Sequence, residues 1–310
     1  MNIAIIGRTE ILYKCIELFE KTEHKILLIV TSKEAPEYTV GSDEFKAKAI
    51  DLGAEFIHTA NILTAIPTIE SLPQLDLGIS LNYSGIIPEQ VISKFRIGIL
   101  NAHGGDLPKY KGNACQAWAI INGEDKIGLC IHKMIGGELD NGNIILKEYL
   151  PIDLNTTITE VYKWFEQIIP KLFFISAELL NKDPNYCMEV QSQYAKDSLR
   201  CYPRRPEDSM INWKNDAVHI LRLINASTFP YSGAISLFEN EIVNIMSAEL
   251  YFDDEVYCSI PGQVALVIPD VGVVVITGGG KILVKDVIIN EKLTKADKLV
   301  KSSRNRFKNA

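Results

Sequence analysis

Residues 2–32 read NIAIIGRTEILYKCIELFEKTEHKILLIVTS, and this stretch decides the fold class. It opens with a short apolar run, continues with apolar residues at helical spacing over 10–22, and ends with a second apolar run over 25–32. A continuous apolar run of this length is typical of a strand that is covered on both faces. The stretch therefore predicts a strand, a helix and a second strand, the unit that builds parallel sheets.

The same alternation continues to residue 103. Further strands are expected over 55–59, 75–84 and 97–103, and further helices over 43–54, 62–72 and 88–95. This order predicts an α/β fold with a doubly wound, Rossmann-like parallel sheet. The turn after the first strand, GRTEIL, lacks the Gly-x-Gly-x-x-Gly pattern, so we interpret Gly7 as a tight turn and not as a dinucleotide site.

The second half of the chain has a different pattern. A strand pair with a long turn is expected over 126–152, and Thr157 with Glu160 forms a capping-box pattern that opens a long helix. A short helix over 215–227 precedes short runs rich in Val, Ile, Tyr and Gly, which are typical of a small OB-like barrel. The predicted boundaries are 1–182 for the catalytic domain, 183–208 for a linker and 209–310 for a β-rich C-terminal domain.

Composition narrows the classes of partner. The chain has 310 residues and a net charge of −7, which argues against a protein that holds nucleic acid by counterion release. The basic segment 291–310 is interpreted as a solvated helix or a frayed terminus. Apolar runs are shorter than the ~18 residues of a membrane span and no signal peptide is evident, so we expect a cytoplasmic protein without a membrane partner.

The sequence gives little support for a metal site or for disulfide bonds. The six cysteines include no Cys-x-x-Cys pair and are expected to be buried free thiols. No group of His, Cys, Asp or Glu has metal-ligand spacing, so no metal is predicted.

The carboxyl end of the strand over 97–103 carries the first candidate chemistry. Asn101 and His103 lie two residues apart, so their side chains share one face of the strand. An imidazole suits proton transfer and an amide can donate to an oxyanion, while Asp140 in a later turn could orient the imidazole. The alternative is that Asn101 and Asp140 form turns and that His103 is a structural strand-end residue. His132 is interpreted as structural.

Residues 202–213, YPRRPEDSMINW, carry the second candidate. The guanidinium groups of Arg204 and Arg205 suit a phosphate or pyrophosphate. The alternative is a linker held by surface salt bridges to Glu207 and Asp208.

These stretches together resemble one family. LNAHGGDLPKYKGNACQAWAIINGE (100–124) and IHKMIGGELDNGNIILKE (131–148) resemble the formyltransferases that use N10-formyltetrahydrofolate. The shared motifs are Asn-x-His, Leu-Pro-x-Tyr-(Arg/Lys)-Gly and Leu-Asp-x-Gly-x-Ile. The resemblance continues through residues 202–213 and 222–234 and spans nearly the whole chain.

The resemblance implies roles for individual residues. Asn101 and His103 would stabilise an oxyanion, and His103 with Asp140 would manage the protons of an attacking amine. Backbone over 80–87 and 136–140 would hold the pterin of the formyl donor, N10-formyltetrahydrofolate. The implied donor-binding residues are Asn82, Tyr83, Ile86, Ile87, Gly136, Gly137 and Leu139. The implied acceptor-binding residues are Gly105, Asp106, Lys109, Tyr110, Tyr202, Arg204, Arg205 and Tyr231.

The acceptor is implied to be a nucleotide-linked amino sugar of the dTDP or UDP type, used for a surface glycan. Trp213, with Tyr202 and Tyr231, would stack on the base, and Lys109 to Lys111 would form a flexible wall. Gly105-Asp106 departs from the family pattern; this acid would oppose a nearby anionic acceptor but could hold an ammonium or a sugar hydroxyl. A homodimer is expected. The alternatives are a methionyl-tRNA formyltransferase, a formyl-folate hydrolase and a non-catalytic folate- or nucleotide-binding module.

Overall fold

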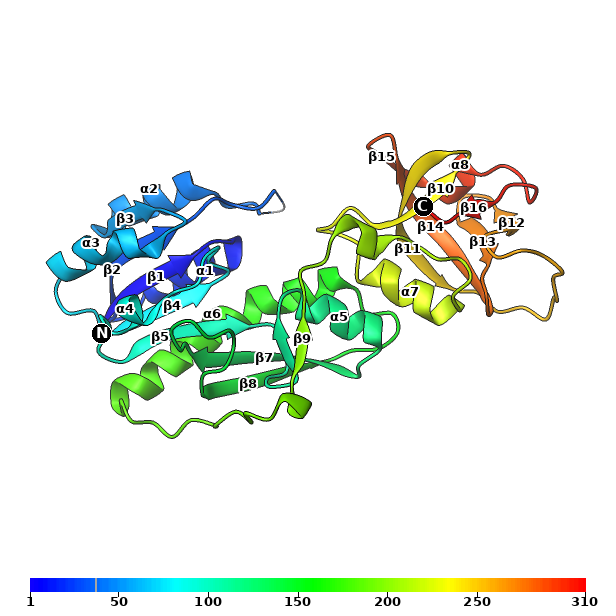
Figure 1. The fold of residues 1–310 in the computed structure, drawn as a ribbon. Helices are drawn as coiled ribbons and strands as arrows, with labels where there is room; N and C mark the ends of the chain where they lie inside the picture. The colour runs from blue at the N-terminus through cyan, green and yellow to red at the C-terminus, as the bar shows by residue number, and fades with distance from the viewer. Residues whose placement is uncertain (37) are drawn as a thin grey trace. The chain divides into compact units, whose positions relative to one another are not determined.

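The computed structural model describes residues 1–36 and 38–310, which fold into two compact units (Figure 1). The first unit comprises Met1–Gly112, Gly128–Tyr149 and Lys163–Cys201. The second comprises Asn113–Ile127, Leu150–Tyr162 and Tyr202–Ala310. Each unit is described by itself below.

A seven-stranded sheet forms the centre of the first unit, in the order β3-β2-β1-β4-β5-β7-β8. The five strands from β3 to β5 are parallel, and β7 runs antiparallel to β5. The predicted α/β fold with a doubly wound sheet is therefore confirmed. The strands are β1 (Asn2–Gly7), β2 (Lys25–Thr31), β3 (Glu55–His58), β4 (Leu77–Leu81), β5 (Gly98–His103), β7 (Lys126–Lys133) and β8 (Ile144–Pro151).

Helices bury both faces of this sheet. In β1, Ala4 and Ile6 pack in a cluster with Val91 of α4, while Ile3 and Ile5 point to the opposite face and are equally buried. This double burial explains why the strands read as continuous apolar runs. The helices are α1 (Glu10–Phe19), α2 (Ser42–Leu52), α3 (Ile66–Ser71), α4 (Glu89–Ile92) and α6 (Ile158–Lys182), with a 3-10 turn at Ile62–Ala65.

Two local predictions have clear physical causes in the structure. Gly7 has a φ of 138°, and a Cβ there would lie 1.9 Å from the backbone oxygen of Leu81, so only glycine fits the turn after β1. Before α6, the Thr157 backbone N–H and hydroxyl both donate to Glu160 Oε2, at 2.7 and 2.8 Å. The predicted capping box therefore begins this helix.

A two-stranded parallel sheet joins distant parts of the first unit. β6 (Tyr110–Gly112) pairs with β9 (Leu199–Cys201). Tyr110 and Lys111 are buried there, so the prediction of a flexible wall over 109–111 is wrong for these two residues. The cause is a strand pairing over about ninety residues, which local sequence does not reveal. Two 3-10 turns flank β9 in the sequence. Ala195–Asp197 precedes it in the first unit, and Pro206–Ser209 follows it in the second unit.

The second unit is a curled antiparallel sheet, a half-barrel, in the order β12-β13-β14-β11-β10-β16, with β15 paired to β14. This confirms the predicted β-rich C-terminal domain. Its strands are β10 (Ala234–Phe238), β11 (Glu241–Leu250), β12 (Val264–Ile268), β13 (Gly272–Ile276), β14 (Lys281–Ile289), β15 (Lys292–Lys295) and β16 (Phe307–Lys308). Its helices are α5 (Cys115–Asn122), α7 (Ala217–Asn225) and α8 (Ala296–Leu299).

The core of this unit corrects two predictions. Trp213 is only 1% exposed, donates from Nε1 to Ser236 Oγ at 3.0 Å, and packs against Phe307, so it is not free to stack on a base. Phe307 is fully buried in β16, which pairs with β10. The basic segment 291–310 is therefore neither a frayed terminus nor a solvated helix, because its apolar side chains complete the core.

Candidate active site

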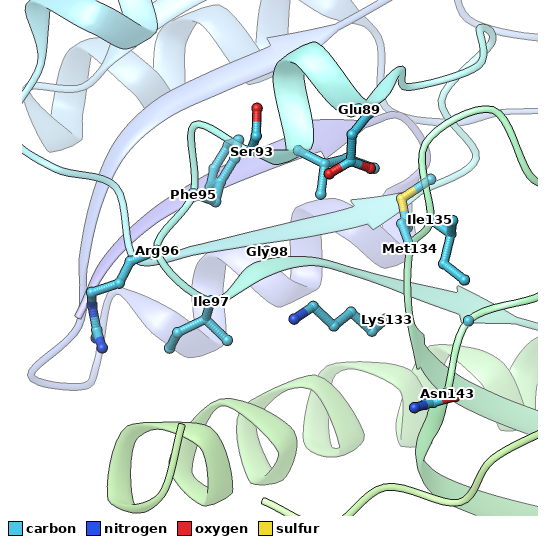
Figure 2. A pocket seen from close by; sticks show the side chains of 12 residues that line it. Glu89, Ser93, Phe95, Arg96, Ile97, Gly98, Lys133, Met134, Ile135 and Asn143 are labelled. Atoms are coloured by element: carbon cyan, nitrogen blue, oxygen red, sulfur yellow. The ribbon is translucent and has the colours of Figure 1, made fainter. Parts of the chain in front are cut away.

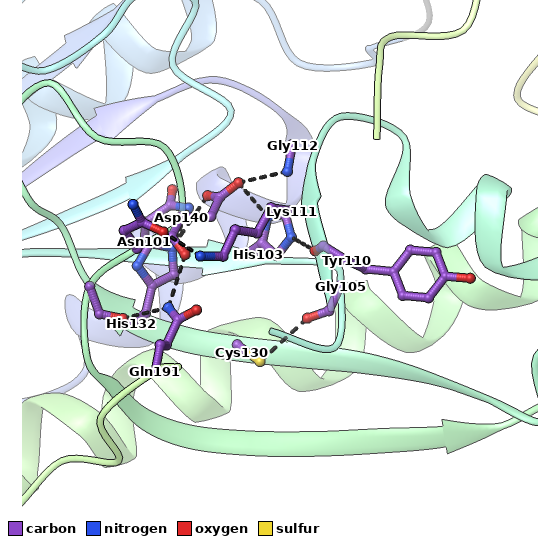
Figure 3. A network of polar contacts seen from close by, with 12 residues as sticks. Asn101, His103, Gly105, Tyr110, Lys111, Gly112, Cys130, His132, Asp140 and Gln191 are labelled. Carbon is purple, nitrogen blue, oxygen red and sulfur yellow. Dashed lines mark hydrogen bonds and ion pairs between the residues drawn. The ribbon is translucent and has the colours of Figure 1, made fainter. Parts of the chain in front are cut away.

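Two neighbouring strands carry the polar residues of the candidate site (Figure 3). In the antiparallel pairing of β5 with β7, Asn101 lies opposite His132 and His103 lies opposite Cys130. His103 and His132 are 6% and 2% exposed. Buried polar groups need partners, so the contacts of these rings determine their protonation and their chemistry.

Asp140 joins these residues from the loop between β7 and β8. Its carboxylate Oδ2 accepts from the Gly112 backbone N–H at 2.9 Å and lies 3.5 Å from His103 Nδ1. Its Oδ1 lies 3.6 Å from His132 Nε2. Burial opposes ionisation of Asp140, but the positive charge that His103 carries when protonated, the contact with His132 and the Gly112 N–H outweigh it and hold its pKa at about 2. Asp140 is therefore a carboxylate at every physiological pH.

The ring of His103 is held by backbone. Its Nε2 donates to the backbone oxygen of Tyr110 in β6 at 2.6 Å. Burial lowers the pKa of His103 below its ordinary value, despite the opposing effects of Asp140 and the Tyr110 oxygen. A neutral ring that is protonated on Nε2 has its lone pair on Nδ1, which faces Asp140. His103 is thus a neutral base beside a permanent anion.

The structure therefore brings the predicted trio of Asn101, His103 and Asp140 together, and it adds two residues. His132, which we interpreted as structural, contacts both Asn101 and Asp140. Lys111 is 9% exposed and donates to the side-chain oxygen of Asn141, next to Asp140. For His132 the missing information was the antiparallel register of β5 and β7. Lys111 was missed as a site residue because the sequence does not show that β6 is buried.

The segment before β9 supports the Asp140 loop from the other side. Gln191 is 2% exposed, and its Nε2 donates to the backbone oxygens of Asp140 at 2.9 Å and Gly142 at 2.6 Å. Asp140 has a φ of 54°, a left-handed conformation that needs such support in a residue other than glycine. The position of its carboxylate is therefore fixed by residues on two distant segments.

The second predicted donor loop contacts the first residue of α4, two residues after the first loop ends at Ile87. The backbone N–H of Gly136 donates to Glu89 Oε2 at 3.2 Å, and a Cβ on Gly136 would lie 2.2 Å from the Glu89 nitrogen. The loops expose apolar side chains, since Ile86 is 75% and Leu139 40% exposed. Exposed apolar side chains beside polar backbone suit a flat aromatic ligand such as a pterin.

The remaining donor-loop residues differ in exposure. Ile87 is buried, and the Tyr83 hydroxyl donates to the backbone oxygen of Thr59 at 2.8 Å. Asn82 and Gly137 are exposed, with φ values of 53° and 79°. Ile87 thus packs in the core beneath the loop, while its neighbours reach the surface.

A cavity of about 360 Å³ adjoins these loops (Figure 2). Glu89 and Ile135 line it, as do Gly98 at the start of β5 and the long side chain of Lys133. A Cβ on Gly98 would lie 2.8 Å from Lys133 Cε, so glycine makes room for that lysine. The cavity lies at the opposite end of β5 from His103, about 16 Å along the strand at the usual rise per residue.

Four predicted acceptor residues belong to the first unit. The carboxylate of Asp106 accepts from the Tyr149 hydroxyl at 2.9 Å, and burial together with this contact raises the pKa of Tyr149 to about 12. The backbone oxygen of Gly105 accepts from the Cys130 thiol at 3.3 Å. Lys109 is exposed with its ammonium 5.3 Å from the centre of the Tyr110 ring. Asp106 thus already holds a hydroxyl, that of Tyr149.

The other four belong to the second unit. Arg204 donates to the backbone oxygens of Ala226 and Asp208 and to the hydroxyls of Ser209 and Ser227, over 2.8–3.2 Å. Its guanidinium is thus engaged within the protein.

The three remaining residues of this group are less constrained. Tyr202 is 69% exposed, Arg205 is exposed, and the Tyr231 hydroxyl lies 2.8 Å from that of Tyr162. Of the two arginines, Arg205 is the one whose side chain reaches the surface.

Family models match both parts of the chain. Residues 1–175 match the model described as formyl transferase, and residues 204–304 match the formyl transferase C-terminal domain. The chain belongs to the formyltransferase family. This confirms the resemblance seen in the sequence and the prediction of a formyl-transferring enzyme.

Relatives of this formyltransferase include two kinds of curated protein. Methionyl-tRNA formyltransferase of Prochlorococcus marinus (strain MIT 9312) is 26% identical over 295 residues, covering 89% of each chain. Bifunctional polymyxin resistance protein ArnA of Wigglesworthia glossinidia brevipalpis is 28% identical over 261 residues, covering 82% of this chain and 38% of that protein.

Solved structures share the fold over nearly the full length. An N-formyltransferase from Helicobacter canadensis, in complex with folinic acid and dTDP-3-aminofucose, has a TM-score of 0.69 at 20% identity and covers 91% of this chain and 98% of its own. WlaRD, a sugar 3N-formyl transferase in the presence of dTDP and 5-N-formyl-THF, has a TM-score of 0.69 at 20% identity, with 92% and 97% covered.

The described residues contain neither a membrane-spanning helix nor a cluster of metal ligands. Over 1–36 and 38–310, no helix is long and apolar enough to cross a membrane. Within the same ranges, no group of three or more His, Cys, Asp or Glu residues is arranged to hold a metal ion.

Proposed function

We propose that this formyltransferase moves the formyl group of N10-formyltetrahydrofolate to the amine of a nucleotide-linked amino sugar. The single observation that carries the chemistry is the buried pairing of neutral His103 with ionised Asp140, beside the amide of Asn101. Such a pair can accept a proton, because the adjacent carboxylate stabilises the imidazolium that forms and offsets part of the cost of its burial.

The residues act at different atoms. Asn101 donates an N–H to the formyl oxygen as negative charge develops there. His103 receives the proton that the attacking amine must lose, at Nδ1, where Asp140 Oδ2 lies 3.5 Å away. The same proton is available to the departing nitrogen, so the acceptor amine exchanges one hydrogen for the formyl group. The backbone oxygen of Tyr110 keeps the ring in place throughout.

The folate donor fits the two loops at Ile86 and Leu139. When bound, it supplies the formyl carbon, and the exposed apolar side chains of these loops would cover its pterin. Gly136 donates to Glu89, which follows the first loop by two residues, so we infer that the two loops would hold a planar ring from two sides. The distinct roles of Asn82, Tyr83, Ile87 and Gly137 are part of this proposal.

The amino-sugar acceptor is supported by charge and by the solved neighbours. The net charge of −7 disfavours a transfer RNA, whose phosphates attract basic surfaces. The Helicobacter canadensis and WlaRD structures, which match this chain along its length, were obtained with dTDP or a dTDP-linked amino sugar. A dTDP or UDP carrier, a cytoplasmic location, a role in surface-glycan synthesis and a homodimer belong to the same proposal.

The competing acceptor is initiator methionyl-tRNA. It is suggested by the sequence similarity of this chain to curated methionyl-tRNA formyltransferases. The deciding experiment incubates the purified protein and N10-formyltetrahydrofolate with a panel of dTDP- and UDP-linked amino sugars and, separately, with methionyl-tRNA. We expect formylated sugar by mass spectrometry and no formylmethionyl-tRNA. Activity on the tRNA alone would contradict the proposed acceptor. Binding of both ligands without turnover would favour the non-catalytic alternative.

A further inference from the structure

His132 makes two contacts that fix the position of its own proton. The ring is 2% exposed and lies opposite Asn101 in the pairing of β5 with β7. Asn101 Nδ2 lies 3.2 Å from His132 Nε2. This arrangement fits an Nε2 without a proton, because an amide nitrogen can only donate. Independently, His132 Nδ1 lies 3.2 Å from the backbone oxygen of Lys133, which can only accept, so Nδ1 carries a proton and in a neutral ring Nε2 carries none.

Asp140 is a second possible hydrogen-bond partner for His132 Nε2. Asp140 Oδ1 lies 3.6 Å from His132 Nε2, and a proton on Nε2 would face that carboxylate. A separation of 3.6 Å is too long for a hydrogen bond, whereas 3.2 Å to Asn101 is within range. The other oxygen of Asp140 is already held by the Gly112 N–H at 2.9 Å. The geometry therefore favours the ring with its lone pair directed at Asn101.

This lone pair selects one of two orientations of the Asn101 side chain. The oxygen and nitrogen ends of an amide are similar in size, so packing alone does not distinguish them. An acceptor at His132 Nε2 fixes the nitrogen end there. One N–H of Asn101 then bonds to the ring, and the second N–H remains available for a substrate oxygen. With a proton on Nε2, the amide oxygen would turn towards the ring instead.

We propose that His132 is a positioning residue, whose unprotonated Nε2 holds the amide of Asn101 with its N–H donors set for the formyl oxygen. The inference rests on the proposed role of Asn101 in formyl transfer. It differs from that role because we assign His132 no contact with the donor or the acceptor, only the hydrogen bond that holds the amide of Asn101.

The first test measures the ring directly and does not need activity. Histidine-selective 15N NMR of the 310-residue chain has five histidines to resolve. The His132 signals are assigned by their absence in His132→Gln. We expect the Nδ1–H tautomer with an unprotonated Nε2 at neutral pH. A neutral ring protonated on Nε2, or an imidazolium, would overturn the inference.

The second test compares two amides at position 132. In His132→Gln, the longer side chain can place its oxygen where Nε2 was and accept from Asn101. In His132→Asn, the shorter side chain reaches only the position of Nδ1. We expect His132→Gln to keep kcat within about threefold and His132→Asn to lose about a hundredfold, comparable with the loss of one oxyanion donor. KM for both substrates should stay unchanged in both variants.

The control is the double variant. Because His132 acts through Asn101, the His132→Asn change should slow an Asn101→Ala protein no further. Circular dichroism and Tm confirm that each variant is folded. Wild-type kcat in His132→Asn, or equal losses in both folded position-132 variants, would overturn the inference. Failure of the wild-type protein to formylate any amino sugar would instead contradict the proposed function, while the NMR result would still decide the tautomer.

Discussion

The Gly112 backbone N–H donates to the carboxylate of Asp140 at 2.9 Å, two residues after the Tyr110 oxygen accepts from His103 at 2.6 Å. One short strand, β6, therefore holds both members of the pair that we propose to move the proton. Lys111, between these two residues, donates to Asn141 beside Asp140. Three consecutive residues thus contact three points of the site.

Replacing His103 should abolish transfer without unfolding the chain. His103→Gln keeps a donor for the Tyr110 oxygen but lacks a base, so we expect kcat to fall by ~10²–10⁴. Steady-state kinetics and circular dichroism check the result. His219→Gln, at an exposed position on α7, is the matched control and should behave as wild type. Turnover within tenfold of wild type in His103→Gln would remove His103 from the proposed mechanism.

The pH dependence of kcat should reflect a depressed histidine pKa. Burial lowers the pKa of His103 below 6.5, and Asp140, Lys111, His132 and the Tyr110 oxygen face the ring. The neutral base therefore persists as pH falls through 6.5, and kcat should decline only at lower pH. The measurement is kcat from pH 4.5 to 8 with both substrates saturating. A half-maximal rate above pH 6.5 would contradict this assignment.

Asp140 should contribute to stability as well as to catalysis. Its pKa of about 2, against 3.8 for an ordinary aspartate, corresponds to about 2 kcal/mol in the free energy of unfolding. A depressed carboxyl pKa stabilises the fold above the unfolded pKa and is lost as pH falls towards 2. Asp140→Asn should therefore unfold more easily in urea at pH 6, and its deficit should shrink from pH 4 to pH 2.5. A deficit independent of pH would point to a packing defect.

We expect Lys111 to affect kcat by holding Asn141, which lies next to Asp140 in the loop. Lys111→Met keeps the buried aliphatic stem but removes the ammonium that holds Asn141, so we expect kcat to fall about tenfold, in line with the loss of a hydrogen bond to a charged group. Lys171→Met, at an exposed position on α6, is the control and should leave kcat unchanged. Stopped-flow and steady-state rates on one amino sugar compare the two. Equal rates in both variants would show that Asn141 does not need this lysine.

Local sequence was sufficient where the structure depends on local physics. The capping box before α6 depends on near neighbours, and the apolar runs indicate strands by their composition alone. The turn at Gly7 could be read from the chain, although the close approach of Leu81 that requires glycine there comes from a distant strand. The shared face of Asn101 and His103 follows from the two-residue period of a strand. Asp140 was a candidate from its place in a later turn, and the motif resemblance supported its pairing with His103, which spacing alone could not establish.

Non-local pairing accounts for what the sequence did not reveal. His132 joins the site because β7 runs antiparallel to β5, a register that neither strand specifies by itself. Trp213 was expected to stack on a nucleotide base, but the C-terminal β16 covers it. The predicted domain boundaries stay predictions, as do the catalytic roles of Asn101, His103 and Asp140 and the predicted donor- and acceptor-binding roles.

The contact of Gln191 with the Asp140 loop bears on how this chain could be recombined with its relatives. Gln191 and β9 lie after the long helix α6, in the segment that the sequence presents as a connector. A hybrid enzyme that took everything after Lys182 from a relative would lose the residues of this chain that hold the Asp140 loop, in addition to its C-terminal domain. A domain exchange aimed at a new acceptor should therefore join the two sequences after Cys201, so that the first unit keeps Gln191 and β9.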